Sequence, residues 1–261
     1  MNSRVPTPED YDRIYRQRTR STILDKIVAG ILRNPRITRL NCTGFLAPGD
    51  PENYRETIRQ WMPKHARPTA LLDLGCGSGR LGVWLAQQLG LNLVGVDFSP
   101  VAISQARRLT VDSMRNKETF LVASFDSTGI QGRSIAAAFS LDALYLATDP
   151  HAALREISRV LVARAPLIFT YYINSDSQHD WPRLTRTAGF DVISVADCTE
   201  SWRTHMREKH KRRWRRRRAL QKELGQRAVG ELSVTASMLG LGGRPSYIST
   251  TFRYVLSAIR R

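Results

Sequence analysis

Cysteines are rare in this 261-residue sequence, acidic residues are outnumbered, and long apolar runs are missing. The three cysteines, Cys42, Cys76 and Cys198, form no C-x-x-C pair, so neither a disulfide framework nor a zinc site is indicated. No run of about 18 apolar residues occurs, which argues against a membrane span, and the charged N-terminal segment lacks the apolar region of a signal peptide. No acidic or histidine set has the spacing of metal ligands. We therefore expect a cytoplasmic protein with neither a metal centre nor a membrane partner.

The positive charge is concentrated in one stretch of the chain. The sequence has 40 Lys and Arg against 23 Asp and Glu, which gives a net charge of +17. Residues 200–230 alone contain twelve basic and three acidic residues, so more than half of the excess lies there. The length suits one α/β domain with an elaboration. The basic stretch is therefore separate from the part that forms the core of this domain.

Residues 69–97 form the unit around which the chain is organised. An apolar run at 69–74 is followed by the glycine-rich loop 75–79, by apolar positions at helical spacing over 81–89, and by a second apolar run at 91–96. This pattern predicts a strand, a glycine turn, a helix and a second, parallel strand. Glycines let a ligand approach the backbone closely, and a helix N-terminus offers unpaired N–H groups. Asp97, at the end of the second strand, suits the hydroxyls of a ribose.

Two motifs in this unit resemble a known family. The dinucleotide fingerprint G-x-G-x-x-G does not fit, because the third glycine comes one position early and an acid stands two positions before the first glycine. The stretch LDLGCGSG at 72–79 resembles the first motif of class I S-adenosylmethionine-dependent methyltransferases, and VGVDFS at 94–99 resembles their second. The resemblance implies an α/β, Rossmann-like fold with a seven-stranded, mostly parallel sheet. It implies S-adenosylmethionine as the cofactor, S-adenosylhomocysteine as the product, and these cofactor-binding residues: Asp73, Gly75, Cys76, Gly77, Gly79, Asp97 and Phe98.

The later segments extend this resemblance. Further strands are predicted at 119–125, 134–140, 166–173, 190–198 and, antiparallel, 252–259, with helices at 52–62, 100–109, 150–162 and 181–189. In similar methyltransferases an acid just past the third strand meets the adenine amino group, and Phe125 and Asp126 fit that position. Asp126 could instead cap the turn that follows it. Ser140, at the end of the fourth strand, is expected beside the transferred methyl group.

Helical spacing over 8–33 predicts one or two N-terminal helices. In the resembled family such a helix often closes over the cofactor, which would bring Tyr11 and Tyr15 to face it. The alternative is that these tyrosines pack on the sheet.

The acceptor site is predicted around the end of the fourth strand. Methyl transfer from a sulfonium is an in-line displacement in which positioning supplies about 7–11 kcal/mol when the geometry is well held. A base is needed only when the acceptor must lose a proton. The candidates are Asp142, Tyr145, Tyr171, Tyr172, His179, His205 and His210, and we take Asp142, Tyr145 and His179 as the predicted catalytic set. Each of them is also explained by a structural or surface role. The segment SLDA at 140–143 lacks the Asn/Asp-Pro-Pro-Tyr motif of similar enzymes that methylate exocyclic amines of nucleic-acid bases, which weighs against that substrate.

The basic stretch lies in an insertion of about fifty residues between the last two strands, longer than an ordinary connection. Residues 202–224 predict a helix ended by Gly225 and Gly230, and in similar small-molecule methyltransferases such an insertion caps the acceptor pocket. Three interpretations stay open. The basic residues form a solvated helix face, or some arginines bind an acidic acceptor, or residues 203–218 contact nucleic acid with Trp202 and Trp214 stacking on bases.

We therefore predict three parts: an N-terminal helical lid at 1–67, a cofactor-binding core at 68–198 and 251–261, and a basic helical cap at 199–250. The predicted function is methylation of a small acceptor, for example an anionic metabolite or a natural-product precursor. The methylated atom and the oligomeric state stay undetermined. The alternatives are a methyltransferase directed at RNA or another nucleic acid, and a binding protein that keeps the cofactor cleft without turnover.

Overall fold

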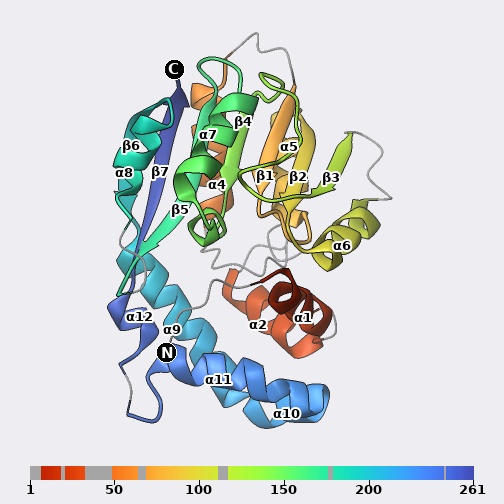
Figure 1. The fold of residues 1–261 in the computed structure, drawn as a ribbon. Coiled ribbons are helices and arrows are strands. Elements are labelled where there is room, and N and C mark those ends of the chain that lie inside the picture. The colour runs from red at the N-terminus through yellow and green to blue at the C-terminus, as the bar shows by residue number, and fades with distance from the viewer. Residues whose placement is uncertain are drawn as a thin grey trace.

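The computed structural model describes residues 7–18, 21–32, 49–63, 69–110, 117–175, 179–243 and 245–261. Parts of the predicted lid, including 33–48, lie outside the described residues. Figure 1 shows a sheet flanked by helices, with a group of further helices below its lower edge. Among the described residues, no helix is long and apolar enough to cross a membrane.

The seven-stranded sheet confirms the predicted fold class. Its order is β3-β2-β1-β4-β5-β7-β6. Strands β1 to β5 pair in parallel, and β7 runs antiparallel to β5 and β6 as the sequence predicted. The strand bounds are Ala70–Leu74 for β1, Asn92–Asp97 for β2, Glu118–Val122 for β3, Ala137–Ser140 for β4, Pro166–Ile173 for β5, Phe190–Asp197 for β6 and Phe252–Arg260 for β7.

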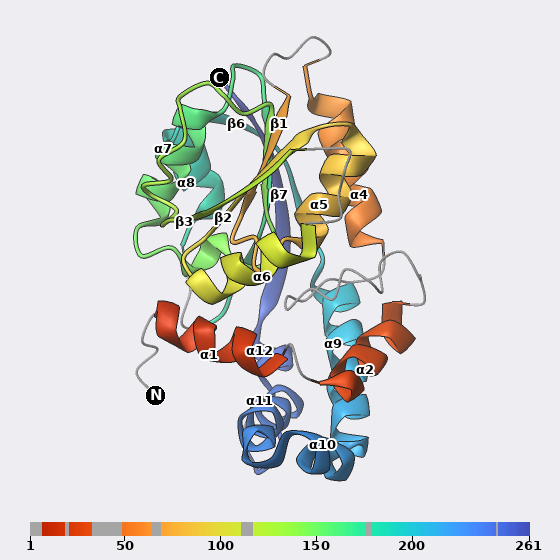
Figure 2. The same cartoon turned by 90° about the vertical axis from the view of Figure 1, so that its right-hand side faces the viewer.

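Helices cover both faces of this sheet (Figure 2). On one face, α4 (Asp50–Trp61), α5 (Arg80–Leu89) and α6 (Pro100–Thr110) bury side chains such as Ile58, Leu85 and Ile103. On the other, α7 (Pro150–Val160) and α8 (Trp181–Thr187) bury Leu154 and Trp181. These residues stand at the helical spacing seen in the sequence, because one apolar stripe of each helix faces the sheet. The two cores hold the carboxyl ends of the strands in place.

The insertion between β6 and β7 differs from the single helix that the sequence predicted. It contains α9 (Thr199–Arg215), α10 (Arg217–Leu224), a short 3-10 turn η2 (Gly225–Arg227), α11 (Ala228–Leu239) and α12 (Tyr247–Thr250). Gly225 ends α10 at a positive φ of 57° as predicted, but the prediction for Gly230 was wrong, because this residue lies inside α11. Gly230 has no neighbour within 4 Å of an added Cβ. An exposed helix interior tolerates such a glycine at a cost of about 1 kcal/mol relative to alanine.

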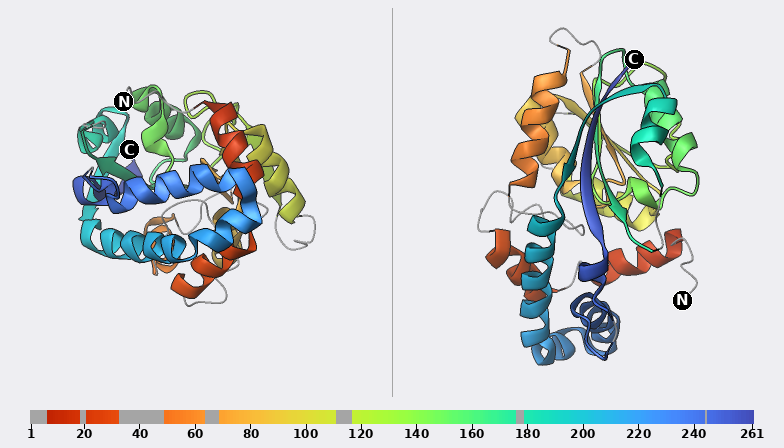
Figure 3. Two further views of the ribbon diagram at one scale, coloured as in Figure 1. Left: turned by 90° about the horizontal axis from the view of Figure 1, so that it is seen from below. Right: turned by 90° about the vertical axis from the view of Figure 1, so that its left-hand side faces the viewer.

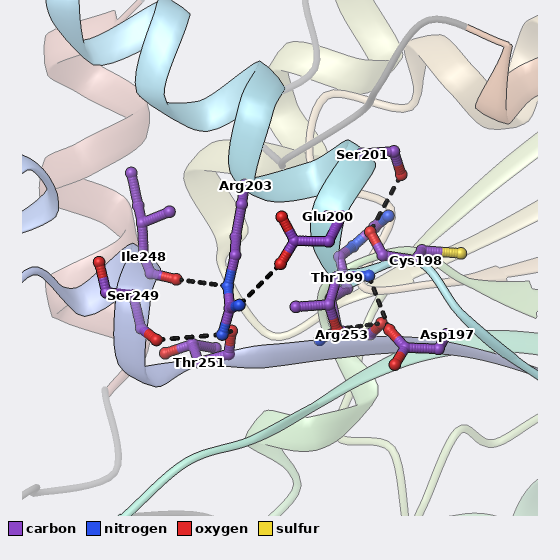
Figure 4. Close-up of polar contacts among 10 residues, drawn as sticks. All are labelled: Asp197, Cys198, Thr199, Glu200, Ser201, Arg203, Ile248, Ser249, Thr251 and Arg253. Carbon is purple, nitrogen blue, oxygen red and sulfur yellow. Dashed lines mark hydrogen bonds and ion pairs between the residues drawn. The ribbon is translucent and has the colours of Figure 1, made fainter.

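The two chain ends of the cap leave the core side by side, as Figure 4 shows. The Cys198 N–H, just after β6, donates to the carbonyl of Arg253 on β7 at 2.9 Å. Beside it, the Arg203 guanidinium donates from Nε to the carbonyl of Ile248 and from Nη2 to that of Ser249, each at 3.0 Å, and pairs with Glu200. One side chain of α9 therefore ties the end of α12 to the start of the insertion.

The two N-terminal helices connect different parts of the molecule. Helix α1 (Pro8–Arg18) lies against α6 of the core, whereas α2 (Thr22–Leu32) lies against α9 and α10 of the cap. The Glu223 carboxylate of α10 accepts hydrogen bonds from the Thr22 N–H at 2.8 Å and from the Ser21 hydroxyl at 2.7 Å, at the start of α2. Arg212 of α9 donates to the carbonyl of Gly30 near the other end. The cap thus holds α2 at both of its ends.

Candidate active site

A cavity of about 520 Å³ lies at the carboxyl ends of the parallel strands. The sheet order places β1 beside β4, the point where connections turn to opposite sides and where sheets of this kind bind ligands. Nine of the fifteen residues predicted for the site line this one cavity: Tyr11, Tyr15, Gly75, Asp97, Phe98, Phe125, Asp126, Asp142 and Tyr145. They come from α1 and from the segments that follow β1, β2, β3 and β4.

The glycine loop after β1 is closely packed. Gly75, Gly77 and Gly79 all have positive φ angles, of 72°, 54° and 72°. A Cβ added to Gly75 would lie 2.2 Å from the Cβ of Ala143, and one added to Gly77 would lie 2.3 Å from the Tyr15 hydroxyl oxygen. The loop therefore needs glycine both for its backbone conformation and for the space that its neighbours occupy.

Asp97 joins this loop to the end of β2. Its carboxylate accepts hydrogen bonds from the backbone N–H groups of Gly77 at 2.8 Å and Ser99 at 2.9 Å. Burial raises the pKa of this carboxyl, and the same two N–H groups oppose that shift. Because carboxylate oxygens have several acceptor sites, Asp97 can hold the loop and still accept from a ligand hydroxyl in the cavity.

We expect Asp97→Ala to weaken cofactor binding by about 1–3 kcal/mol, because the two ribose hydroxyls of the bound cofactor lose their hydrogen-bond acceptor. Isothermal titration with S-adenosylhomocysteine measures this loss. Asp191→Ala, which removes an exposed carboxylate on β6, is the control and should leave the affinity unchanged. An unchanged affinity of the Asp97 variant would refute the assignment.

The other six predicted residues do not line the cavity. Cys76, Gly77 and Gly79 lie in the loop itself, whereas Asp73 is buried and accepts a backbone hydrogen bond from Gly82 of α5. Burial, followed by the nearby Asp97 charge, raises the pKa of Asp73 well above its ordinary value.

Ser140 and His179 also have other surroundings. Ser140 is fully buried, and its hydroxyl donates to the carbonyl of Leu74 and accepts from the N–H of Leu144. It fixes the turn after β4. His179 is exposed just before α8, with its ring edge-on to Trp181 at 6.0 Å. The structure therefore does not bring His179 to the cavity, because α8 packs against β6 at the edge of the sheet.

Aromatic rings from the lid and the core meet at one end of the cavity. The ring centroids of Tyr11 and Phe98 are 5.2 Å apart. Asp12, on the same helix as Tyr11, accepts from the Ser99 hydroxyl and from the Val101 N–H at the start of α6. Helix α1 is thus fixed over the cavity by its contacts with α6. In the wall of the same cavity, Asp126 accepts a hydrogen bond from the Ser124 hydroxyl, two residues before it.

Asp142, at the end of β4, is the most constrained residue of the site. It has a φ of +52°, which is uncommon for a residue other than glycine. Its Oδ1 accepts from the Tyr172 hydroxyl at 2.6 Å and from Thr170 at 3.1 Å, and it pairs with Arg253 at 3.4 Å. These partners come from β5 and β7. They hold the carboxylate in the cavity wall with its side chain only 2% exposed.

Arg253 is the residue that the sequence analysis missed. Its side chain is 1% exposed, and it also pairs with Asp50 of α4 at 3.5 Å. Burial alone lowers the pKa of a guanidinium, but the surrounding acidic groups, Asp142 first, raise that of Arg253 well above its ordinary value. A lone arginine within the apolar pattern of 252–259 was the signal in the sequence.

Tyr145 lies between the cavity and the cap. Its ring is edge-on to Tyr172 at 4.9 Å. Burial, with smaller effects from Tyr11 and Asp142, raises the pKa of Tyr145 well above its ordinary value. The phenol therefore keeps its proton at neutral pH and can orient a ligand as a hydrogen-bond donor, but it is unsuited to act as a base.

The charge of the cavity wall is negative. Its described lining contains four aspartates and no Lys, Arg or His: Asp97, Asp126, Asp142 and Asp149. Asp149 also caps α7 by accepting from the N–H groups of His151 and Ala152. None of the basic residues at 203–218 lines the cavity. Such a wall fits a cationic ligand, as a sulfonium is, and the size of the cavity suits a small-molecule site.

Comparisons with known proteins agree with this architecture. Residues 71–164, just over a third of the chain, match a family model described as "Methyltransferase domain". The structure of the cyclase SpnF is similar with a TM-score of 0.73 and 17% identity, over 98% of this chain and 97% of that one. Phosphoethanolamine N-methyltransferase 2 of Haemonchus contortus, with phosphomonomethylethanolamine and S-adenosylhomocysteine, gives a TM-score of 0.68 and 19% identity over 95% of this chain and 60% of that one.

The geranyl diphosphate C-methyltransferase of Streptomyces coelicolor A3(2), in complex with Mg²⁺, geranyl diphosphate and S-adenosylhomocysteine, is more distant. Its TM-score is 0.58 and its identity is 13%, over 80% of this chain and 79% of that one. At such identities the likeness to solved structures concerns the fold.

Proposed function

We propose that this chain is a class I S-adenosylmethionine-dependent methyltransferase and that it methylates a small molecule in the cavity beneath its N-terminal helix α1. The observation that carries the proposal is the position of α1, which lies over the cavity and is fixed to α6 through Asp12. A polymer would need an open path to the ends of the strands. A covered cavity of about 520 Å³ suits a compact acceptor instead.

Different residues of the chain would hold the cofactor and the acceptor. The glycine loop and Asp97 would hold the ribose and amino-acid parts of the cofactor, and Phe98, Phe125 and Asp126 would surround its adenine. When bound, S-adenosylmethionine supplies an electrophilic methyl group on sulfur and leaves as S-adenosylhomocysteine. Asp142 and Tyr145, at the end of β4, would orient the acceptor.

The charge of the wall points to a neutral or basic acceptor. One interpretation that the sequence left open was an anionic acceptor bound by arginines of the insertion, but the described lining contains aspartates and no Lys, Arg or His. Asp142 is already paired with Arg253, and an anionic acceptor would be repelled by Asp126 and Asp149. An amine in its neutral form attacks with its own lone pair and loses a proton only after the transfer, so the reaction does not require Tyr145, whose raised pKa keeps it protonated, as a base. We therefore favour N-methylation of an amine.

The nucleic-acid alternative has less support. Trp202, one of the two aromatics proposed to stack on bases, is fully buried with its ring centroid 5.6 Å from that of Tyr172. Arg203 and Arg212 donate to backbone carbonyls inside the protein.

Methyl-labelled S-adenosylmethionine tests the proposal. Purified protein is incubated with separate pools of small amines, small carboxylic and phosphoric acids, and RNA. We expect label in the amine pool. Asp142→Asn, which keeps the shape but removes the charge, should lower turnover by about 10-fold or more, as the loss of a charged hydrogen-bond acceptor does. Asp191→Asn, on the exposed face of β6, serves as the matched control.

Label in the acid pool alone would overturn the assignment of acceptor charge, and label in RNA alone would replace a small acceptor with a polymer. Binding of S-adenosylmethionine by calorimetry without label in any pool would favour a binding protein.

A further inference from the structure

The basic residues of the cap fall into two groups with different surroundings. The side chains of the first group make contacts with other parts of the protein. Arg203 and Arg212 donate to carbonyls, Arg213 pairs with Glu231 of α11 at 3.3 Å, and the Arg217 guanidinium lies 5.2 Å from the centre of the Trp214 ring. These residues build the cap, so they do not explain the remaining positive charge.

The second group is exposed at the end of the cap. We call it the basic tip, and it consists of Lys211, Arg215, Arg216, Arg218, Lys222 and Arg227. Lys211 and Arg215 are four residues apart on α9, and Arg218 and Lys222 are four apart on α10, so each pair shares one helix face. Figure 1 and the right-hand view of Figure 3 show α10 and α11 at the end of the molecule furthest from the C-terminus.

Few acidic side chains balance this charge. Glu208 of α9 pairs with Arg212 and lies near Lys211 and Arg215. Residues 211–243 contain nine Lys and Arg and two acids, Glu223 and Glu231. Glu223 accepts from the start of α2, and Glu231 pairs with Arg213, and neither is exposed. Like charges this dense repel one another, and an external anion would relieve that repulsion.

Exposed aliphatic side chains accompany the basic tip. Val229, two residues after Arg227 at the start of α11, is 70% exposed, and Val234 of the same helix is 48% exposed. Helix α11 packs directly against α10. Basic residues next to exposed aliphatic ones match the two parts of a lipid surface, the headgroups and the acyl boundary.

We propose that the basic tip docks on the surface of a membrane that contains anionic lipids. The sequence predicted no membrane partner, and the described residues contain no spanning helix, so the contact is peripheral. A membrane suits this surface better than a nucleic acid does, because Trp202 is buried and the Trp214 ring is covered by Arg217. The docking surface lies outside the cavity and is independent of the proposed acceptor.

Vesicle co-sedimentation of the full chain tests the proposal. One set of vesicles contains phosphatidylcholine alone, and in the other about a third is phosphatidylglycerol. We expect binding to the second set only, with release as the ionic strength rises from about 0.05 M to about 0.5 M. Each basic residue near such a surface raises partitioning about fivefold, so Arg215→Gln, Arg218→Gln and Lys222→Gln together should lower it about 100-fold.

The matched control removes three exposed positive charges elsewhere, with Arg108→Gln, Lys117→Gln and Arg155→Gln. It should keep wild-type partitioning. The proposal is overturned if neither vesicle binds, if both bind equally, or if the control triple loses as much as the tip triple. It is also overturned if a single-stranded RNA oligonucleotide binds through the tip while the anionic vesicles do not.

Discussion

Arg253→Met is expected to lower the free energy of unfolding by about 3–5 kcal/mol, the cost of removing one partner from a buried ion pair. The guanidinium is 1% exposed and pairs with Asp142 and Asp50. Without it, the carboxylates of Asp50 and Asp142 lose the cation that they share, and the hydroxyls of Thr170 and Tyr172 are left as donors to Asp142. Urea unfolding followed by circular dichroism measures the change.

Two further variants make this test specific. Arg253→Lys keeps the charge but loses the planar fork, so it should recover part of the stability. Arg261→Met, at the other end of the same strand, breaks a pair in which both side chains are more than half exposed and should change the stability by less than about 1 kcal/mol. If Arg253→Met unfolded no more easily than Arg261→Met, the buried cluster would not be a source of stability.

Gly75→Ala is expected to destabilise the protein by about 2–5 kcal/mol. About 1–2 kcal/mol comes from a non-glycine residue at positive φ, and about 1–3 kcal/mol from crowding against Ala143. Because Gly75 lines the cavity, the displaced loop should also bind S-adenosylhomocysteine more weakly. Thermal unfolding with and without this ligand reports both effects.

Gly129 provides a matched control for the backbone contribution. Its φ is +70°, close to the +72° of Gly75, but nothing lies within 4 Å of a Cβ added there. Gly129→Ala should therefore show the backbone cost alone. Adding Ala143→Gly to Gly75→Ala should recover the crowding cost and leave the backbone cost. Equal stabilities of Gly75→Ala and Gly129→Ala would show that the approach of Ala143 is unimportant.

The sequence predicted the sheet and the cavity because both depend on local patterns. Apolar runs ending in Asp73 and Asp97, with a glycine loop between them, specify a parallel unit whose strand ends meet at one edge. The lining residues follow the strands directly, so finding the strands also located Phe125 and Asp142.

The rest of the site depends on contacts between distant parts of the chain. Asp50 and Arg253 are about 200 residues apart in sequence, and no spacing rule relates them. In the same way, the twelve basic residues at 200–230 look alike in the sequence. In the structure, Arg213 is buried against Glu231, whereas Arg218 is exposed. Tertiary packing decides between these outcomes.

The position of the cap's two ends has a consequence for how this enzyme could diversify. The insertion leaves β6 at Cys198 and returns at Phe252, and the hydrogen bond between Cys198 and Arg253 closes that neck. Because the chain leaves and re-enters the sheet at neighbouring strands, a different module could replace the insertion without changing strand pairing, provided that it also packs against α2 and Tyr172. Exchange of residues 199–250 as a block would then change the surface around α2, while the described residues that line the cavity, none of which belongs to this block, are inherited intact.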